Sequence, residues 1–308
     1  MPYSNSLTFG PIPSRRFGIS LGIDLSPATK QCNFDCLYCE LEPAKTVDKM
    51  DSYPKVSDVI EAVQEAFTKH EKIDVLTITA NGEPTLYPKL DELVDELDKV
   101  KGNAKTLILS NGANIYEKRI QNTLKKLDSV KLSLDCISKE CFKKLDRNDT
   151  SVDVEKIVQG MIEFRALYDK SFVLEVLFVK NMNDKPKEIG LLYEAIKKIN
   201  PNRVDVGTID RPPAYDVKPV SYETLSMVAN TFEGINVNIA YKNRPNAVQN
   251  FTEEEIIALL QRRPLTPEDI ENMFAQNSKL TLQTLVDSGK VKVVDSSGVK
   301  FYKISQFV

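Results

Sequence analysis

Apolar residues recur along the chain in two alternating patterns. Short runs rich in β-branched residues are separated by longer stretches in which apolar positions are spaced three and four apart. The short runs predict strands and the longer stretches predict amphipathic helices. We expect strands at 20–25, 75–79, 106–109, 130–134, 173–179 and 203–206. The helices expected between them lie at 56–70, 89–99, 116–127, 152–168 and 187–198.

A strand followed by a helix, repeated six times, predicts an α/β fold with a parallel sheet. Polar motifs stand just past the carboxyl end of nearly every expected strand, where parallel barrels carry their chemistry. We therefore expect a partial (β/α)6 TIM-like barrel rather than an open doubly wound sheet. A further apolar run at 237–241 is expected to cover the edge of the barrel or close the domain.

The last sixty residues have a different pattern. Helices are predicted at 252–262, with Thr252 as cap, at 266–274, which opens with Thr266 and Pro267, and at 278–288. A hairpin of 290–294 and 299–304 follows. Three helices and a two-stranded wing predict a winged helix-turn-helix. The expected domains are thus a barrel at 1–245 and a winged helix at 250–308.

Charge limits what this tail can do. It holds seven basic and eight acidic residues, and its candidate recognition helix carries only Lys279. A docking or packing module is therefore favoured over DNA binding, although both stay open. The whole chain has a net charge of -3, so any affinity for nucleic acid would need a local basic patch.

Length and apolar content place the chain among soluble globular proteins. Its 308 residues suffice for one large domain with a small appendage. No apolar run reaches the length of a membrane span and the first residues do not resemble a signal peptide, so we expect a cytoplasmic protein without membrane contact. Five clustered cysteines suit a reducing compartment better than a disulfide framework.

The strongest chemical signal is a set of three cysteines. Cys32, Cys36 and Cys39 stand at C-x3-C-x2-C spacing. Three thiolates can hold three irons of one 4Fe-4S cluster and leave the fourth iron open to a small molecule. A zinc-stapled interaction protein is the alternative, but it would need a fourth ligand nearby. The other candidate ligands lie far along the chain: Cys136, Cys141 and the single histidine, His70.

The cysteine spacing, with Tyr38 directly before Cys39, resembles the signature of the radical S-adenosylmethionine (SAM) superfamily. The resemblance implies that the open iron binds the amino and carboxylate groups of SAM. An electron from the reduced cluster then splits SAM to a 5'-deoxyadenosyl radical, and Tyr38 lies near the adenine. It also implies a one-electron donor such as flavodoxin or ferredoxin.

Two further segments extend this resemblance. Gly82-Glu83-Pro84 follows the strand at 75–79 and is similar to a Gly-Gly-Glu-Pro segment that binds the SAM ammonium, with Asn81 in place of the first glycine. The alternative is an ordinary turn. Ser110 and Asn111 follow the next strand and resemble a Thr-Asn-Gly segment that positions SAM or substrate. The alternative here is a polar turn with Asn114 as helix cap.

Later strands supply the remaining candidates. Lys131, Ser133 and Asp135 share one strand face, which suggests a ligand, or else a polar edge strand. Ser133 would bond the SAM carboxylate or ribose, and Asp135 would orient substrate. By resemblance, Asn181 belongs to an Asn-Asp turn found at this place in the superfamily, and Gly207 belongs to the segment that wraps the adenine.

Four residues have no settled role. Arg211 is a candidate for binding a phosphate or carboxylate. Cys136 and Cys141 would be substrate-proximal thiols, auxiliary ligands or, as we favour, small buried apolar residues. His70 ends a helix and is interpreted as a surface cap rather than a base.

The segment from Phe9 to Asp24, with Gly10-Pro-Ile-Pro-Ser-Arg-Arg16, resembles a radical SAM subfamily related to the enzymes that build the wyosine base of tRNA. Those enzymes hold a second cluster on extra N-terminal cysteines, whereas this chain has no cysteine before Cys32. Arg15 and Arg16 would contact an anionic substrate such as tRNA or form salt bridges within an N-terminal hairpin.

We therefore expect an oxidoreductase-like radical SAM enzyme. Its substrate is unidentified, with an RNA base as the first candidate, and no catalytic side chain is assigned. The rival is an iron-sulfur or SAM-sensing regulator that acts through its winged helix.

Overall fold

The computed structural model describes residues 7–14, 17–239, 248–262, 264–296 and 299–305. Its main sheet has eight strands in sequence order, β1 to β8. The first, β1 (Thr8–Ser14), runs antiparallel to β2 (Gly18–Asp24). All later neighbours pair in parallel: β3 (Val75–Thr79), β4 (Lys105–Ser110), β5 (Ser129–Ser133), β6 (Ser171–Phe178), β7 (Arg203–Thr208) and β8 (Val237–Ile239).

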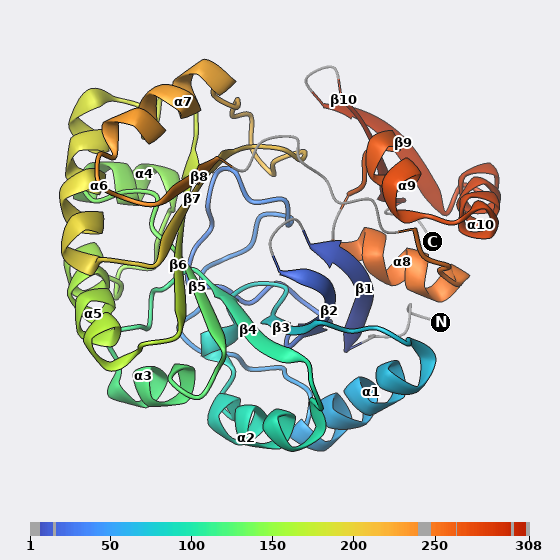
Figure 1. The fold of residues 1–308 in the computed structure, drawn as a ribbon. Coiled ribbons are helices and arrows are strands. Elements are labelled where there is room, and N and C mark those ends of the chain that lie inside the picture. The colour runs from blue at the N-terminus through green and yellow to red at the C-terminus, as the bar shows by residue number, and fades with distance from the viewer. Residues whose placement is uncertain (1–6, 15–16, 240–247, 263, 297–298, 306–308) are drawn as a thin grey trace.

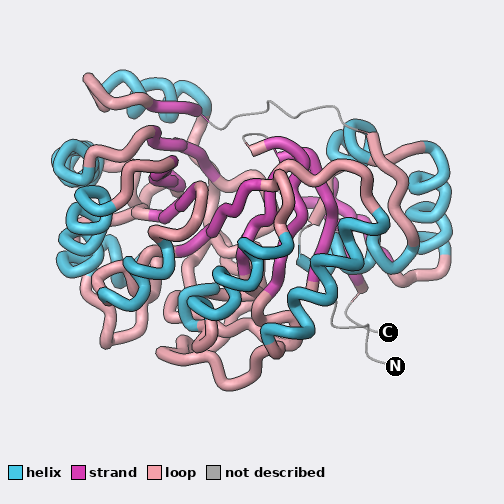
Figure 2. The backbone as a smooth tube through the Cα atoms, turned by 60° about the horizontal axis from the view of Figure 1, so that its bottom comes forward, coloured by secondary structure: helices cyan, strands magenta, loops and turns pink. Residues whose placement is uncertain are grey.

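Helices cover the convex side of this curved sheet (Figure 1, Figure 2). They are α1 (Val56–Lys69), α2 (Leu90–Val100), α3 (Lys118–Leu124), α4 (Lys139–Leu145), α5 (Val154–Leu167), α6 (Pro186–Ile199) and α7 (Tyr222–Thr231), with a short 3-10 turn η1 (Pro84–Leu86). Each buries an apolar stripe, such as Val59 and Val63 of α1, against the outward residues of the strands. The predicted α/β fold with a mainly parallel sheet is confirmed, and it is consistent with a partial barrel built on β2 to β7.

The sheet has one strand beyond the six barrel strands at each edge, β1, which was not predicted, and β8. The sequence of β1 contains Gly10, Pro11 and Pro13, which are typical turn residues. Proline is tolerated there because an edge strand leaves some of its N–H positions unpaired, and the register shifts between Phe9 and Ile12. At the opposite edge, β8 realises part of the expected run at 237–241, whose last two residues lie outside the described ranges.

Two helices were not predicted. α4 and α7 are short, and each begins at a serine whose hydroxyl accepts a backbone N–H: Ser138 from Cys141, and Ser221 from Thr224. This N-cap bond supports a short helix without a long apolar repeat. Their amphipathic signal is therefore too brief to recognise in the sequence.

The last part of the chain forms three helices and a hairpin, which we call the C-terminal unit (residues 248–262, 264–296 and 299–305). Its elements are α8 (Glu253–Arg262), α9 (Pro267–Met273), α10 (Gln276–Asp287), and the antiparallel pair β9 (Val291–Ser296) and β10 (Val299–Ile304). Thr252 and Thr266 cap their helices as expected. Its hydrophobic core includes Ile12 of β1, and the unit lies beside that edge of the sheet (Figure 1).

Among the described residues, two ion pairs and one histidine–carboxylate contact join the C-terminal unit to the barrel. Arg262 pairs with Asp24 at 2.9 Å, Lys303 with Glu42 at 2.9 Å, and His70 lies 3.3 Å from Glu255. His70 does cap α1, but it faces α8 and only 17% of its side chain is exposed, so it is not the free surface residue that was expected. Within the described residues, no helix is both long and apolar enough to cross a membrane.

Candidate functional site

A cavity of about 940 Å3 lies on the concave side of the sheet, toward the carboxyl ends of the strands. Side chains or backbone from β1 to β7 line it, as parallel barrels commonly arrange their sites. The three cysteines and the segments after β3 and β4 reach the same cavity. α8 also reaches it with Gln261 and Arg262. Of the candidate residues, the three cysteines, Tyr38, Gly82, Glu83, Ser110, Asn111, Ser133 and Gly207 line this cavity, whereas Pro84, Asp135 and Asn181 do not.

The cysteines lie on the loop of residues 25–55, between β2 and α1, which we call the cysteine loop. On one side Gln31 donates its N–H to the Asn81 carbonyl at 2.9 Å, and its own carbonyl accepts from Glu83 at 2.9 Å. On the other side the N–H groups of Asp35 and Leu37 donate to the carbonyls of residues 146 and 145. The loop is thus held at both flanks by backbone bonds.

Cys32, Cys36 and Cys39 are free, half-buried thiols. Burial raises the pKa of Cys32 to about 12, and it raises the pKa of Cys36 as well. The Cys32 sulfur accepts the Phe34 N–H at 3.4 Å and the Asn111 side-chain amide at 3.6 Å. Metal coordination replaces the thiol protons, and N–H donors aimed at sulfur stabilise a metal-bound thiolate. This donor set fits an iron-sulfur cluster.

Gly82 occupies a position that only glycine can fill. Its φ is +135°, and a Cβ atom built there would lie 1.8 Å from the Gln31 carbonyl oxygen. The cysteine loop and the segment after β3 therefore meet without any side chain between them. Pro84, two residues later, begins the turn η1, so the predicted turn is present as well.

Glu83 joins the segments after β3 and β4. Its buried carboxylate accepts four hydrogen bonds. Oε1 takes the Thr85 N–H, the Thr85 hydroxyl and the Ser110 hydroxyl, at 2.9, 2.6 and 2.7 Å, and Oε2 takes the Asn111 N–H at 2.8 Å. Burial raises the pKa of Glu83 although these bonds oppose the shift. The residue still lines the cavity, so it both organises the site and faces its contents.

Asn111 turns its side chain toward the cysteine loop. Its Nδ2 donates to the Asn33 side-chain Oδ1 at 2.7 Å and to the Cys32 sulfur at 3.6 Å. Asn114 is not the helix cap proposed from sequence, because Glu117 precedes α3 and the Asn114 amide instead donates to the Thr85 hydroxyl at 3.0 Å. The segment after β4 is therefore a network that connects Glu83 with Cys32.

Ser133 lines the cavity at the end of β5, whereas Asp135 lies behind the cysteine loop. The Tyr38 hydroxyl donates to Asp135 Oδ2, and the Leu177 N–H donates to Oδ1 at 2.7 Å. Burial raises the pKa of Asp135 to about 7. The geometry thus gives Asp135 a partner on the loop, so it holds Tyr38 rather than a substrate that occupies the large cavity.

The turn after β6 uses a different asparagine from the one selected in sequence. Asn181 has a φ of 65°, is exposed, and does not line the cavity. The fully buried Asn183 accepts the Val179 N–H at 2.8 Å and donates to the Asp135 carbonyl at 2.9 Å. Gly207 after β7 does line the cavity.

Arg211, beyond β7, also reaches the cavity and pairs with Glu40 of the cysteine loop at 2.9 Å. Its carboxylate partner therefore comes from this chain. Arg15 and Arg16, the other proposed anion contacts, lie outside the described residues.

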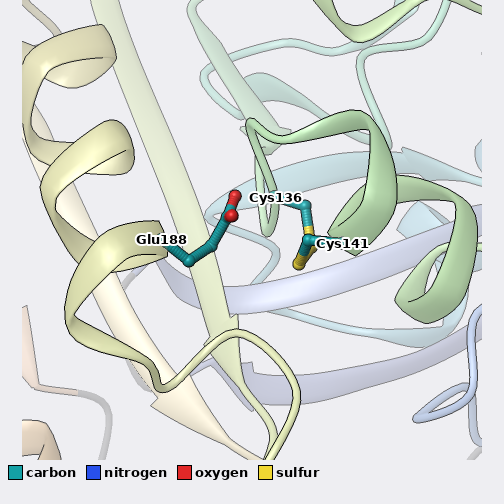
Figure 3. Close-up of side chains that lie close together, drawn as sticks. All are labelled: Cys136, Cys141 and Glu188. Carbon is teal, nitrogen blue, oxygen red and sulfur yellow. A yellow bond between two sulfur atoms is a disulfide. The ribbon is translucent and has the colours of Figure 1, made fainter.

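Cys136 and Cys141 form a disulfide at the start of α4 (Figure 3). This corrects the expectation of reduced cysteines. Figure 3 also shows Glu188 facing the pair, but its carboxylate already accepts the Ser138 N–H at 2.9 Å and the Ser138 hydroxyl at 2.6 Å. The three side chains therefore make a closed structural contact rather than an auxiliary metal site.

Several residues of this site were not predicted. Asp24 does carry a recognisable signal, because it is a polar residue at the carboxyl end of β2. Asn33 and Asn183 stand in loops where asparagine is common. Arg262 comes from α8 and reaches the cavity only through tertiary packing.

Comparison with known proteins identifies the family. Residues 26–191 match the sequence profile described as the radical SAM superfamily. The chain belongs to the radical SAM superfamily. This radical SAM chain is also 40% identical over 299 residues to a UPF0026 protein of Helicobacter pylori, a match that covers 96% of the chain and 97% of the relative. It therefore belongs with the UPF0026 proteins.

Solved structures support the same fold for this radical SAM chain. A structure of Streptococcus suis SuiB bound to S-adenosylmethionine has a TM-score of 0.53 at 19% identity and covers 69% of this chain and 48% of that one. A structure of TYW1 with a lysine-pyruvate adduct bound has a TM-score of 0.52 at 15% identity and covers 97% and 83%. At these identities the likeness concerns the fold alone.

Proposed function

We propose that this protein is an enzyme that cleaves SAM reductively and uses the resulting radical to abstract hydrogen from a substrate. The observation that carries the proposal is that three free thiols line the same cavity as Glu83 and Ser133, with N–H donors on the Cys32 sulfur. Bound on Cys32, Cys36 and Cys39, one 4Fe-4S cluster supplies the electron and an open iron for SAM. The barrel orients SAM and excludes water and oxygen.

In this proposal the SAM ammonium lies at the Gly82 backbone and Glu83, whose Oε2 accepts one protein hydrogen bond against three at Oε1 in the described chain. Pro84 fixes the turn that follows. Ser110 and Asn111 hold the Glu83 carboxylate in place. Ser133 is assigned a hydrogen bond to the SAM carboxylate or ribose.

The adenine is assigned to the opposite side of the cavity, between Tyr38 and the Gly207 segment. Tyr38 would be held by Asp135, which accepts its hydroxyl proton in a hydrogen bond. We give no SAM contact to Asn181, because it is exposed outside the cavity.

A nucleobase in RNA is the proposed substrate class, with flavodoxin or ferredoxin as electron donor and the cytoplasm as location. We propose a barrel domain at 1–245 and a winged helix at 250–308 that packs or docks. A DNA-reading regulator is less favoured, because Lys279 of α10 pairs with Glu271 at 2.5 Å and α8 faces the barrel.

The test is anaerobic. The full chain is reconstituted with iron and sulfide, reduced with dithionite and mixed with SAM, and 5'-deoxyadenosine is quantified. We expect product from the parent and only background from Cys36→Ala, because a missing thiolate leaves an iron without its ligand. The matched control is the double variant Cys136→Ala/Cys141→Ala, which should retain the product. If no 5'-deoxyadenosine forms and the EPR spectrum of the reduced cluster does not change when SAM is added, the proposal is excluded.

A further inference from the structure

The C-terminal unit supplies a charged side chain to the cavity wall. Arg262, the last residue of α8, lines the cavity, and its Nε donates to Asp24 Oδ2 at 2.9 Å. Both partners are largely buried, with 12% of the Arg262 side chain and 3% of the Asp24 side chain exposed. This ion pair connects residues that are 238 positions apart in the chain.

Asp24 transmits the contact to the segment after β3. While Oδ2 accepts from Arg262, Oδ1 accepts the backbone N–H groups of Ser26 and Asn81, both at 2.9 Å. Asn81 directly precedes Gly82, and its carbonyl accepts the Gln31 N–H of the cysteine loop. One carboxylate therefore links the C-terminal unit to the junction of the cysteine loop and the Gly82 segment.

The orientation of Arg262 is fixed by its own surroundings. Nη1 donates to the Ala258 carbonyl at 2.9 Å, and the guanidinium lies over the Phe9 ring, 5.2 Å from its centroid. A buried carboxylate that lost its cation would be left uncompensated, and it would shift toward water. That shift would weaken the hydrogen bond from the Asn81 N–H.

We infer that Arg262 is a positioning residue for SAM binding: through Asp24 it fixes the backbone of the Gly82 segment, so that the C-terminal unit completes the binding site. The inference rests on the proposed function. A purely structural role can be told apart from this one. The contacts His70–Glu255 and Lys303–Glu42 also hold the unit to the barrel, but neither involves Asp24.

The first measurement needs no cluster. Amide hydrogen exchange is followed at Asn81 in the parent, Arg262→Gln, Arg262→Lys and Glu255→Gln. Arg262→Gln should accelerate exchange at Asn81 about tenfold, the effect of losing roughly 1.4 kcal/mol of protection. Arg262→Lys keeps the positive charge but lacks the planar guanidinium group. Its exchange rate at Asn81 should lie between those of Arg262→Gln and the parent. Glu255→Gln loosens the same interface elsewhere and should leave Asn81 unchanged.

The second measurement uses the reconstituted full chain. Equilibrium binding of SAM and the kinetics of 5'-deoxyadenosine formation are compared across the same variants, with Lys279→Gln as a charge-matched control on α10. Arg262→Gln should raise Kd and KM for SAM about tenfold while kcat changes less than threefold, because the thiols are untouched. Arg262→Lys should recover part of the affinity.

Equal effects of Arg262→Gln and Glu255→Gln on exchange and on SAM affinity would overturn the inference in favour of simple docking. If Arg262→Gln does not fold, Arg262→Lys decides between the two, because its Asn81 exchange must exceed that of the parent for the inference to stand. If the parent binds no SAM, the proposed function is refuted. If the parent binds SAM and the folded Arg262 variants bind it with the same affinity, only this inference is refuted.

Discussion

Gly82 is the residue at which the cysteine loop and the segment after β3 touch. Gln31 forms an isolated parallel bridge with it, and the Gln31 carbonyl occupies the space where a side chain would begin. The glycine is required for two separate reasons, its positive φ and this contact. Side-chain size at one position therefore controls whether the two predicted binding segments can meet.

We expect Gly82→Ala to lower the free energy of unfolding by at least about 2 kcal/mol, because the new methyl group forces the Gln31 backbone away. Chemical denaturation measures this loss. The control is Gly190→Ala in α6, where an added Cβ meets nothing within 4 Å. That variant should be neutral or gain up to about 1 kcal/mol. Equal stability of the two variants would contradict the role given to Gly82.

The connection from Asp135 to Asp146, which includes α4, supports the cysteine loop at both of its ends. Asp135, at the beginning, accepts from Tyr38, and Asp146, at the end, accepts from the Cys36 thiol at 3.7 Å. The disulfide between Cys136 and Cys141 closes the connection between them. A rigid peptide segment thus backs the loop on the side away from the cavity.

This connection should make stability depend on pH. Burial raises the pKa of Asp135 from 3.8 to about 7, with Tyr38, Glu175, Lys131 and Asp146 as its charged or titratable neighbours. The folded protein then holds this proton more tightly than the unfolded chain does. The resulting stabilisation is complete below about pH 4 and is lost as the pH rises through about 7.

We therefore expect the free energy of unfolding of the parent to fall between pH 5 and pH 8 more steeply than that of Asp135→Asn, in urea titrations. The amide keeps an acceptor for the Leu177 N–H. Asp48→Asn, at a position outside this connection, should follow the parent. Parallel curves for Asp135→Asn and the parent would show that this carboxyl does not titrate in the range.

Most strands and helices of the barrel could be predicted, since burial on one face leaves a periodic apolar pattern. The residues of β2 to β7 and the long helices carry that pattern. β1 was missed because Pro11 and Pro13 usually mark turns, and only the sheet edge makes them acceptable. α4 and α7 were missed because a capped helix of one to three turns needs little periodicity.

The residues of the candidate site likewise fall into those that could be predicted from the sequence and those that could not. Cys32, Cys36 and Cys39 stand out by their spacing, whereas Gly82 and Glu83 were selected by resemblance to a superfamily segment. The Asp24–Arg262 pair depends on how the C-terminal unit packs, which no local pattern records. Asp135 was recognised as polar and inward-facing, but its actual partner, Tyr38, comes from a different loop.

The two proposed domains share part of one hydrophobic core. Ile12 of β1 is 9% exposed and belongs to the core of the C-terminal unit, together with residues of α8 and α10. A strand of the barrel therefore contributes to both parts, so unfolding of one part removes packing from the other.

We expect Ile12→Ala to lower the free energy of unfolding by about 2 to 4 kcal/mol, as for other large-to-small core changes. Hydrogen exchange should accelerate in both β2 and α8. Val299→Ala, at a 45% exposed position of β10, should change stability by less than about 0.5 kcal/mol. Faster exchange in β2 with no change in α8 would contradict the shared core.

The backbone bonds that hold the cysteine loop involve only polypeptide: Gln31 with its neighbours after β3, and Asp35 and Leu37 with the end of α4. Small zinc domains, by contrast, unfold when their metal leaves. If the protein carries the proposed cluster, these bonds would keep the three thiols in place after the cluster is lost to oxygen. Iron and sulfide could then be reloaded into the folded protein, and under the proposed function the polypeptide would outlast its cluster.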